Sequence, residues 1–184
     1  MAEIVVGITG GIAAYKTAAL VSKLVQDGDG VSVVMTASAE RFIGAATFAA
    51  LTGRGVARNI FDEAQFPLGA HITLAERADL LVVAPASADF LAKAAHGLAD
   101  DLLATLYLAF KGPVLMAPAM NTAMWEQPAV QRNIAQLRTD GIHFVEPTSG
   151  WLSCRQVGAG RMAEPETILA AIRGVQTSGN SGKK

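Results

Sequence analysis

Short apolar runs, separated by segments of mixed polarity, recur along the 184-residue chain. The runs Glu3–Ile8, Val31–Met35, Leu80–Ala84 and Pro113–Ala117 are continuous rather than alternating, which is typical of strands buried on both faces of a parallel sheet. Ile142–Glu146 adds a shorter run near the end. Because helical segments separate these strands, the pattern predicts an α/β fold with helices on both faces of the sheet.

The intervening segments carry helical periodicity or capping residues. We predict helices over Tyr15–Gln26, Ala39–Leu51, a short stretch after His71, Leu91–His96, Leu102–Phe110, Thr122–Leu137 and Glu164–Arg173. Residues 52–68 are predicted to be irregular, a length typical of functional or covering loops. Residues 1–174 are predicted to form a single domain, and the polar residues 175–184 a disordered tail.

Composition narrows the classes of function. Hydrophobic residues make up 51% of the chain and charged residues 17%, yet no apolar run approaches the roughly 20 residues of a membrane span. The surplus apolar surface predicts a homo-oligomer, with no membrane partner. The net charge of −1 and the lack of a basic run argue against nucleic acid. A single cysteine and no secretory signal pattern predict a cytoplasmic protein.

Small and polar residues follow three of the predicted strands. A glycine turn, Thr9–Ala14, comes after the first strand, Thr36–Ser38 after the second, and Pro85–Phe90 after the third. Carboxyl ends of parallel strands meet at one edge of a sheet, so these segments are predicted to share one site. A glycine turn before a helix suits a phosphate group, but its spacing matches neither the dinucleotide fingerprint nor the P-loop. The alternative is a set of tight turns and helix caps.

The segment Met116–Trp125 is a strand-to-helix corner at the same predicted edge. Its Asn121 amide can donate and accept hydrogen bonds, which suits a bound ligand. The alternative is that Asn121 caps the next helix while the methionines fill the core.

Two further side chains are candidates for chemistry. His71 can exchange protons near neutral pH, or it can be a structural hydrogen-bonding group. No cluster with ligand spacing surrounds it, so no metal site is predicted. Cys154 lies in the glycine-rich segment 148–163, predicted to be a mobile flap that closes over a substrate. The alternative for Cys154 is a small buried hydrophobe.

In their order along the chain, several segments resemble the homo-oligomeric flavin-containing cysteine decarboxylases. They are Gly7–Lys16, His71–Ile72, Ala84–Asp89, Pro118–Trp125 and Gly150–Met162. The corner and the cysteine segment are the most specific of these matches. One departure is Arg155, because the family commonly has glycine after the cysteine.

The resemblance implies a three-layer, Rossmann-like (flavodoxin-like) sheet and FMN as cofactor. It also implies a trimer or dodecamer, with the flavin near a subunit interface. The implied phosphate contacts are Gly10, Gly11, Ile12, Thr36, Ala37 and Ser38, and the implied contacts of the ring and ribityl chain are Ser87, Ala88, Asp89, Phe90 and Ala119. The implied substrate contacts are Asn121, Met124 and Arg161, with His71 as acid/base and Cys154 as proton donor.

The activity implied by the resemblance is oxidative decarboxylation of the cysteine moiety of 4'-phosphopantothenoylcysteine, then reduction to 4'-phosphopantetheine, in coenzyme A biosynthesis. Cysteine has no carbonyl beta to its carboxylate, so oxidation at the thiol-bearing carbon must first create an electron sink. Three alternatives remain open: decarboxylation of a peptidyl C-terminal cysteine of the lantibiotic type, a flavin prenyltransferase, and a non-catalytic flavin-binding regulatory subunit.

Overall fold

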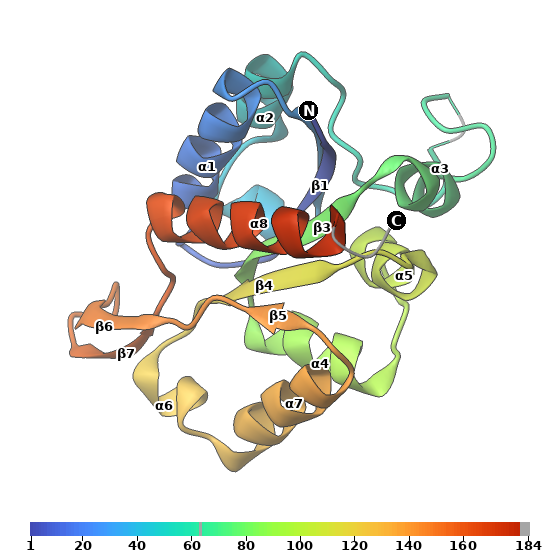
Figure 1. Ribbon diagram of the computed structural model, residues 1–184. Coiled ribbons are helices and arrows are strands. Elements are labelled where there is room, and N and C mark those ends of the chain that lie inside the picture. Colours follow the sequence, from blue (N-terminus) through green and yellow to red (C-terminus); the bar gives the residue numbers. More distant parts are fainter. Residues whose placement is uncertain (63, 181–184) are drawn as a thin grey trace.

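The computed structural model describes residues 1–62 and 64–180. Five parallel strands form the central sheet in the order β2-β1-β3-β4-β5, with helices on both faces (Figure 1). The strands are β1 Glu3–Ile8, β2 Gly30–Met35, β3 Leu80–Ala86, β4 Val114–Pro118 and β5 His143–Phe144. This order is that of flavodoxin-like sheets, so the predicted fold class is confirmed.

Two layers of helices cover the sheet. One layer holds α1 (Ala14–Gln26), the short helix η1 (Ala39–Arg41), α2 (Ala45–Thr52) and α8 (Pro165–Asn180). The other layer holds α3 (Ala70–Arg77), α4 (Ala88–His96), α5 (Leu102–Ala109) and α7 (Pro128–Thr139). No helix in the described part of the chain is long and apolar enough to span a membrane.

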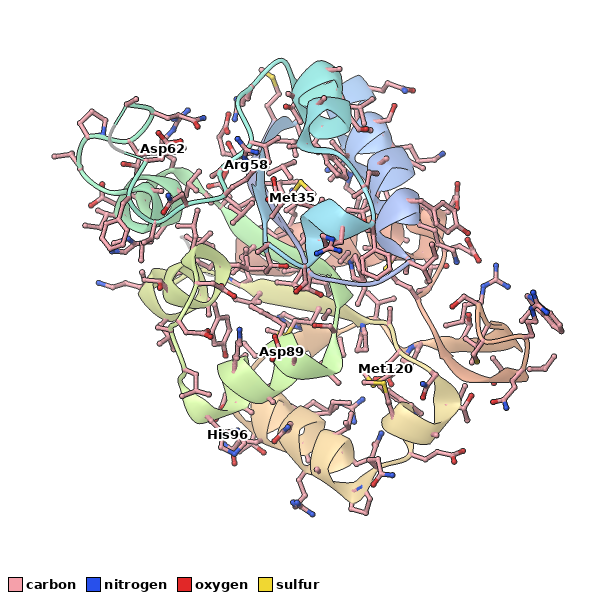
Figure 2. The ribbon with its side chains drawn as sticks, turned by 180° about the vertical axis from the view of Figure 1, so that it is seen from behind. Met35, Arg58, Asp62, Asp89, His96 and Met120 are labelled. Carbon is pink, nitrogen blue, oxygen red and sulfur yellow. The ribbon has the colours of Figure 1, made fainter. Side chains whose placement is uncertain are left out.

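The central strands are almost entirely apolar because their side chains enter two cores, one on each face of the sheet. In β3, Leu80 and Val82 enter the core beneath α1 and α8, whereas Leu81 and Val83 enter the core beneath α3, α4 and α5. Side chains fill the space between the layers, as the buried Met35 at the end of β2 illustrates (Figure 2). The continuous runs in the sequence are the signature of this two-sided burial.

Two predicted helices are each broken in the structure. The helix predicted over Ala39–Leu51 is wrong, because extended backbone at Gly44 separates η1 from α2. The helix predicted over Thr122–Leu137 is also wrong, because it divides into α6 (Thr122–Trp125) and α7. Pro128 opens α7, and proline favours that position since it has no N–H to leave unpaired.

The end of the chain also differs from the prediction. Helix α8 continues to Asn180 rather than ending at Arg173, so residues 175–180, predicted to be disordered, are helical. Residues 181–184 of the predicted tail lie outside the described residues. Arg173 forms ion pairs with Asp27 (2.8 Å) and Asp29 (2.5 Å), which hold α8 against the turn between α1 and β2.

We expect Arg173→Ala to lower the free energy of unfolding by about 1–3 kcal/mol, since it leaves the nearly buried Asp29 carboxylate without its ion-pair partner. Urea unfolding at a fixed protein concentration measures this loss. Arg132→Ala is the matched control, because Arg132 is exposed on α7 and has no polar partner among the described residues. Equal stability of Arg173→Ala and the wild-type protein contradicts the prediction.

Candidate functional site

One buried side chain joins the ends of β1 and β3. The hydroxyl of Thr9 donates to the carbonyl of Pro85 (2.7 Å) and accepts from the N–H of Ser87 (2.9 Å). Thr17 in α1 donates to the carbonyl of Ala84 (2.7 Å). Because the strand order reverses between β1 and β3, these bonds set the geometry of the edge where doubly wound sheets bind ligands.

Two adjoining cavities open at this edge, with volumes of about 400 and 460 Å³. Of the residues singled out in the sequence, the first cavity is lined by Gly10, Gly11, Ile12, Ser87, Ala88, Ala119, Asn121, Met124, Cys154 and Arg161. The second is lined by Gly10, Thr36, Ala37, Ser38, Ser87, Ala88, Asp89, Phe90 and Met124. The shared residues make the two cavities neighbours. The segments at the strand ends thus line a pair of neighbouring cavities.

His71 lines neither cavity within one chain. It lies in the first turn of α3, and its Nδ1 atom is buried without a hydrogen-bond partner in the structure. Two residues separate the end of α3 from the start of β3, and no residue of α3 lines either cavity. Within one chain, the fold therefore does not bring His71 into either cavity.

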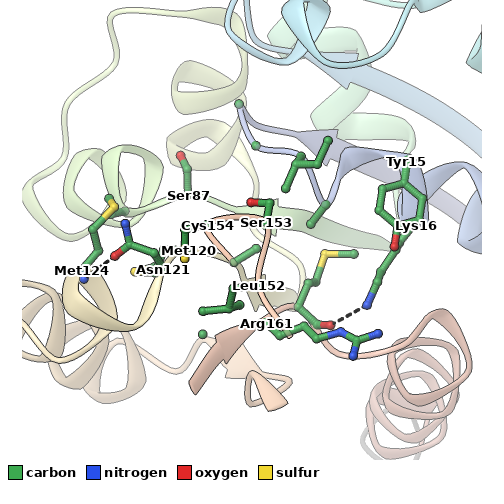
Figure 3. A pocket seen from close by; sticks show the side chains of 18 of the residues that line it. Tyr15, Lys16, Ser87, Met120, Asn121, Met124, Leu152, Ser153, Cys154 and Arg161 are labelled. Carbon is green, nitrogen blue, oxygen red and sulfur yellow. Dashed lines mark hydrogen bonds between the residues drawn. The ribbon is translucent and has the colours of Figure 1, made fainter. Parts of the chain in front are cut away.

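Asn121 both caps a helix and lines the first cavity. Asn121 is the N-cap of α6, and its Oδ1 accepts a hydrogen bond from the N–H of Met124 (2.8 Å; Figure 3). This bond fixes the orientation of the amide, and Nδ2 has no partner among the described residues. The two interpretations of Asn121 are therefore compatible, because the cap uses the acceptor and leaves the donor for a ligand.

The residues predicted to be a flap form a β-hairpin, with β6 (Thr148–Trp151) antiparallel to β7 (Val157–Arg161). Cys154 is exposed in the connecting turn and lines the first cavity (Figure 3). Arg155, which follows it, has a φ of 64°, in the left-handed region. A three-residue hairpin loop ends in that conformation, which glycine adopts most readily.

Lys16 is a wall residue of the first cavity that the sequence analysis did not single out. Its side chain is only 7% exposed, and Nζ donates to the carbonyl of Met162 (3.1 Å) and to Glu164 (2.9 Å). The hydrogen bond from Lys16 lowers the pKa of Glu164, and Arg161 (2.8 Å) adds to the effect. The signal that could have found Lys16 is its place in the helical turn after the glycine segment.

The only lysine of the second cavity is fully paired. Lys93 lies 3.3, 3.0 and 3.4 Å from Asp89, Asp100 and Asp101. Burial alone would lower the pKa of Lys93, but the hydrogen bond to Asp100 and the charges of the other two carboxylates raise it. Lys93 is therefore committed to these carboxylates. Within the described residues, no group of three or more His, Cys, Asp or Glu side chains is arranged to hold a metal ion.

A doubly wound sheet with its cavities at the strand-order reversal defines a ligand-binding α/β protein. The model of the Flavoprotein family matches residues 1–177, and this chain belongs to that family. It is 50% identical over 162 residues to the coenzyme A biosynthesis bifunctional protein CoaBC of Bacillus subtilis, covering 88% of this chain and 40% of that protein. The chain thus spans less than half the length of the curated relatives it matches.

Solved structures agree with this assignment. A PPC decarboxylase mutant complexed with pantothenoylaminoethenethiol is 32% identical, with a TM-score of 0.84 and coverage of 94% of this chain and 96% of that one. The FMN-dependent cysteine decarboxylase SpaF is 35% identical, with a TM-score of 0.81 and coverage of 93% and 94%.

We expect Arg155→Gly to stabilise the hairpin by about 1 kcal/mol, since it relieves a left-handed backbone at a side-chain-bearing residue. The readout is amide exchange of Leu152, whose N–H donates to the carbonyl of Gln156 (2.8 Å) across the turn. Exchange should slow roughly fivefold. Gln156→Gly is the control, because its backbone has no positive φ and glycine there relieves nothing. Faster or unchanged exchange in Arg155→Gly would refute the interpretation.

Proposed function

We propose that this protein is an FMN-dependent decarboxylase of coenzyme A biosynthesis. It oxidatively decarboxylates the cysteine moiety of 4'-phosphopantothenoylcysteine and then reduces the product to 4'-phosphopantetheine. The observation that carries the proposal is one cavity of a flavoprotein fold lined by both the Asn121 amide and the Cys154 thiol. The names of the curated relatives and of the PPC decarboxylase structure support it.

The residues at the strand ends fit FMN. In the described part of the chain, the backbone N–H groups of Gly10, Gly11 and Ile12 have no hydrogen-bond partner, and no cap bond engages the Ser38 hydroxyl. These donors, with Thr36 and Ala37, suit a phosphate at the start of α1, where the helix dipole favours an anion. Ser87, Ala88, Asp89, Phe90 and Ala119 would hold the ring and ribityl chain, between the two cavities.

The first cavity suits the substrate. The chemistry that FMN would supply here is removal of a hydride from the thiol-bearing carbon and its later return. The free Nδ2 of Asn121 would donate to the substrate carboxylate, and Met124 would pack against the substrate. Arg161 would attract its anionic groups. The thiol of Cys154, which lines the cavity, would donate the proton that completes the reduction.

A second copy of the chain would complete the site with His71. The Nδ1 atom of His71 is buried without a partner, and the loop before α3 and its first turn carry exposed large hydrophobic side chains at Phe61, Leu68 and Ile72. Such a surface suits contact with another subunit, and a neighbour's cavities would then receive the imidazole as acid/base. We propose a homo-oligomer on this basis, a trimer or a dodecamer. The cytoplasmic location and the single domain over residues 1–174 stay predictions.

The alternative substrate is a peptide that ends in cysteine. The likeness to the solved structure of the peptidyl-cysteine decarboxylase EpiD supports it, because that protein is named for this class of substrate. The curated relatives favour the coenzyme A substrate. The same cavity would bind the cysteine moiety of either substrate, so the two alternatives differ only in the contacts to the rest of the substrate.

The decisive experiment combines absorbance of the purified protein with mass analysis of its products. We expect a flavin spectrum that identifies as FMN after extraction, and conversion of 4'-phosphopantothenoylcysteine to 4'-phosphopantetheine. A peptide with a C-terminal cysteine is the parallel substrate. Turnover of the peptide alone supports the alternative substrate. A protein that lacks flavin and does not take up FMN on reconstitution contradicts the proposal.

We expect Cys154→Ser to release CO2 but to stop at the oxidised, decarboxylated product, because serine is a far weaker acid than a thiol at the proton-donating position. Mass spectrometry distinguishes this product from 4'-phosphopantetheine by two hydrogens. Ser153→Ala, one residue away in the same turn, is the control for perturbation of the turn itself. Formation of 4'-phosphopantetheine by Cys154→Ser at the wild-type rate would show that Cys154 is not the proton donor.

We expect His71→Asn to bind FMN and to lose CO2 release, because the imidazole acts on substrate held by another chain. Co-expression with Asn121→Ala chains tests the arrangement. Mixed oligomers should regain activity at those sites where an intact His71 faces an intact Asn121. A double variant His71→Asn/Asn121→Ala, mixed with itself, is the control. Loss of FMN from His71→Asn would make the histidine structural, and absence of complementation would place both residues in one chain.

A further inference from the structure

The cysteine-bearing hairpin contacts the body of the protein through β7. The N–H of Met120 donates to the carbonyl of Gly160 (3.0 Å), and the hydroxyl of Thr122 donates to the carbonyl of Ala159 (2.8 Å). Strand β6 is largely exposed, with Trp151 at 63%. The hairpin projects from the molecule beside α6 (Figure 1). The corner that carries Asn121 is thus the surface on which the hairpin docks.

The docking surface fits two glycines closely. A Cβ added at Gly158 would lie 2.2 Å from the Thr122 hydroxyl oxygen. A Cβ added at Gly160, whose φ is 108°, would lie 2.4 Å from the carbonyl oxygen of Met120. Both distances are shorter than any allowed contact, so the strand can approach the corner only where it carries no side chain.

Among the described residues, Thr122 is the only one outside the hairpin whose side chain hydrogen-bonds to residues 148–160. Lys16 donates to the carbonyl of Met162, which follows β7, and so holds the residue after the hairpin rather than the hairpin itself. The Asn121 amide and the Cys154 thiol, which line the same cavity, are therefore linked through the neighbour of Asn121 and through β7.

We propose that Thr122 is a positioning residue whose hydroxyl docks the hairpin on the Asn121 corner and thereby sets Cys154 against the first cavity. The effect of this docking on proton donation by Cys154 rests on the proposed function. The docking itself does not, because it is a property of the hydrogen bond between Thr122 and Ala159.

The first readout is amide exchange of the full-length protein as purified, followed by mass spectrometry of peptides that span residues 118–125 and 157–161. Thr122→Val keeps the shape and removes the hydroxyl. We expect roughly fivefold faster exchange of the Met120 amide and of β7, the change expected when one hydrogen bond is lost. Thr122→Ser should restore the wild-type rate. Thr139→Val is the matched control, because it removes a similar hydroxyl-to-carbonyl bond within α7.

The second readout is the ratio of oxidised, decarboxylated product to fully reduced product. We expect this ratio to rise in Thr122→Val, to return in Thr122→Ser and to stay unchanged in Thr139→Val. Gly158→Ala pushes β7 away while it keeps the hydroxyl, and it should raise the ratio as well. A purely structural role of Thr122 would lower both half-reactions together and leave the ratio unchanged.

Unchanged exchange in Thr122→Val overturns the docking role. Faster exchange with an unchanged product ratio overturns the link to Cys154. A wild-type protein that releases no CO2 contradicts the proposed function instead, and the exchange rates still decide whether Thr122 docks the hairpin.

Discussion

The junction between β1 and β3 is the constraint on which the site depends. Thr9 is 2% exposed and bonds to Pro85 in β3 and to Ser87, the N-cap of α4, so the first glycine turn and the start of α4 hold a fixed separation. The edge between them is also where the strand order reverses, which leaves room for a ligand between diverging connections. Both cavities adjoin this junction, and neither could keep its shape if the two strand ends moved apart.

The corner after β4 combines two tasks in one amide. The cap of α6 uses the Oδ1 atom of Asn121 as acceptor. The same bond orients the side-chain amide, so that its donor, Nδ2, is left for the cavity. The same corner receives β7 through Met120 and Thr122. Structural and chemical roles are therefore not competing explanations for these residues.

Charge is distributed differently in the two cavities. Arg161 and Lys16 share the single carboxylate of Glu164, which leaves one net positive charge beside the first cavity. The lysine of the second cavity is surrounded by three carboxylates. An anion in the first cavity can thus be attracted by side chains, whereas one in the second depends on backbone N–H groups and hydroxyls.

The sequence alone determined the sheet, because strands buried on both faces must be apolar at every position, and it identified the strand-end segments that line the cavities. The predicted helices missed the break before Pro128 and the extension of α8 past Arg173, because helix boundaries depend on local backbone geometry as well as on the apolar pattern. The place of Lys16 in the first helical turn after the glycine segment is a signal that the sequence carries. Only the tertiary structure placed His71 outside the cavities of its own chain, because that placement depends on how α3 packs against the sheet.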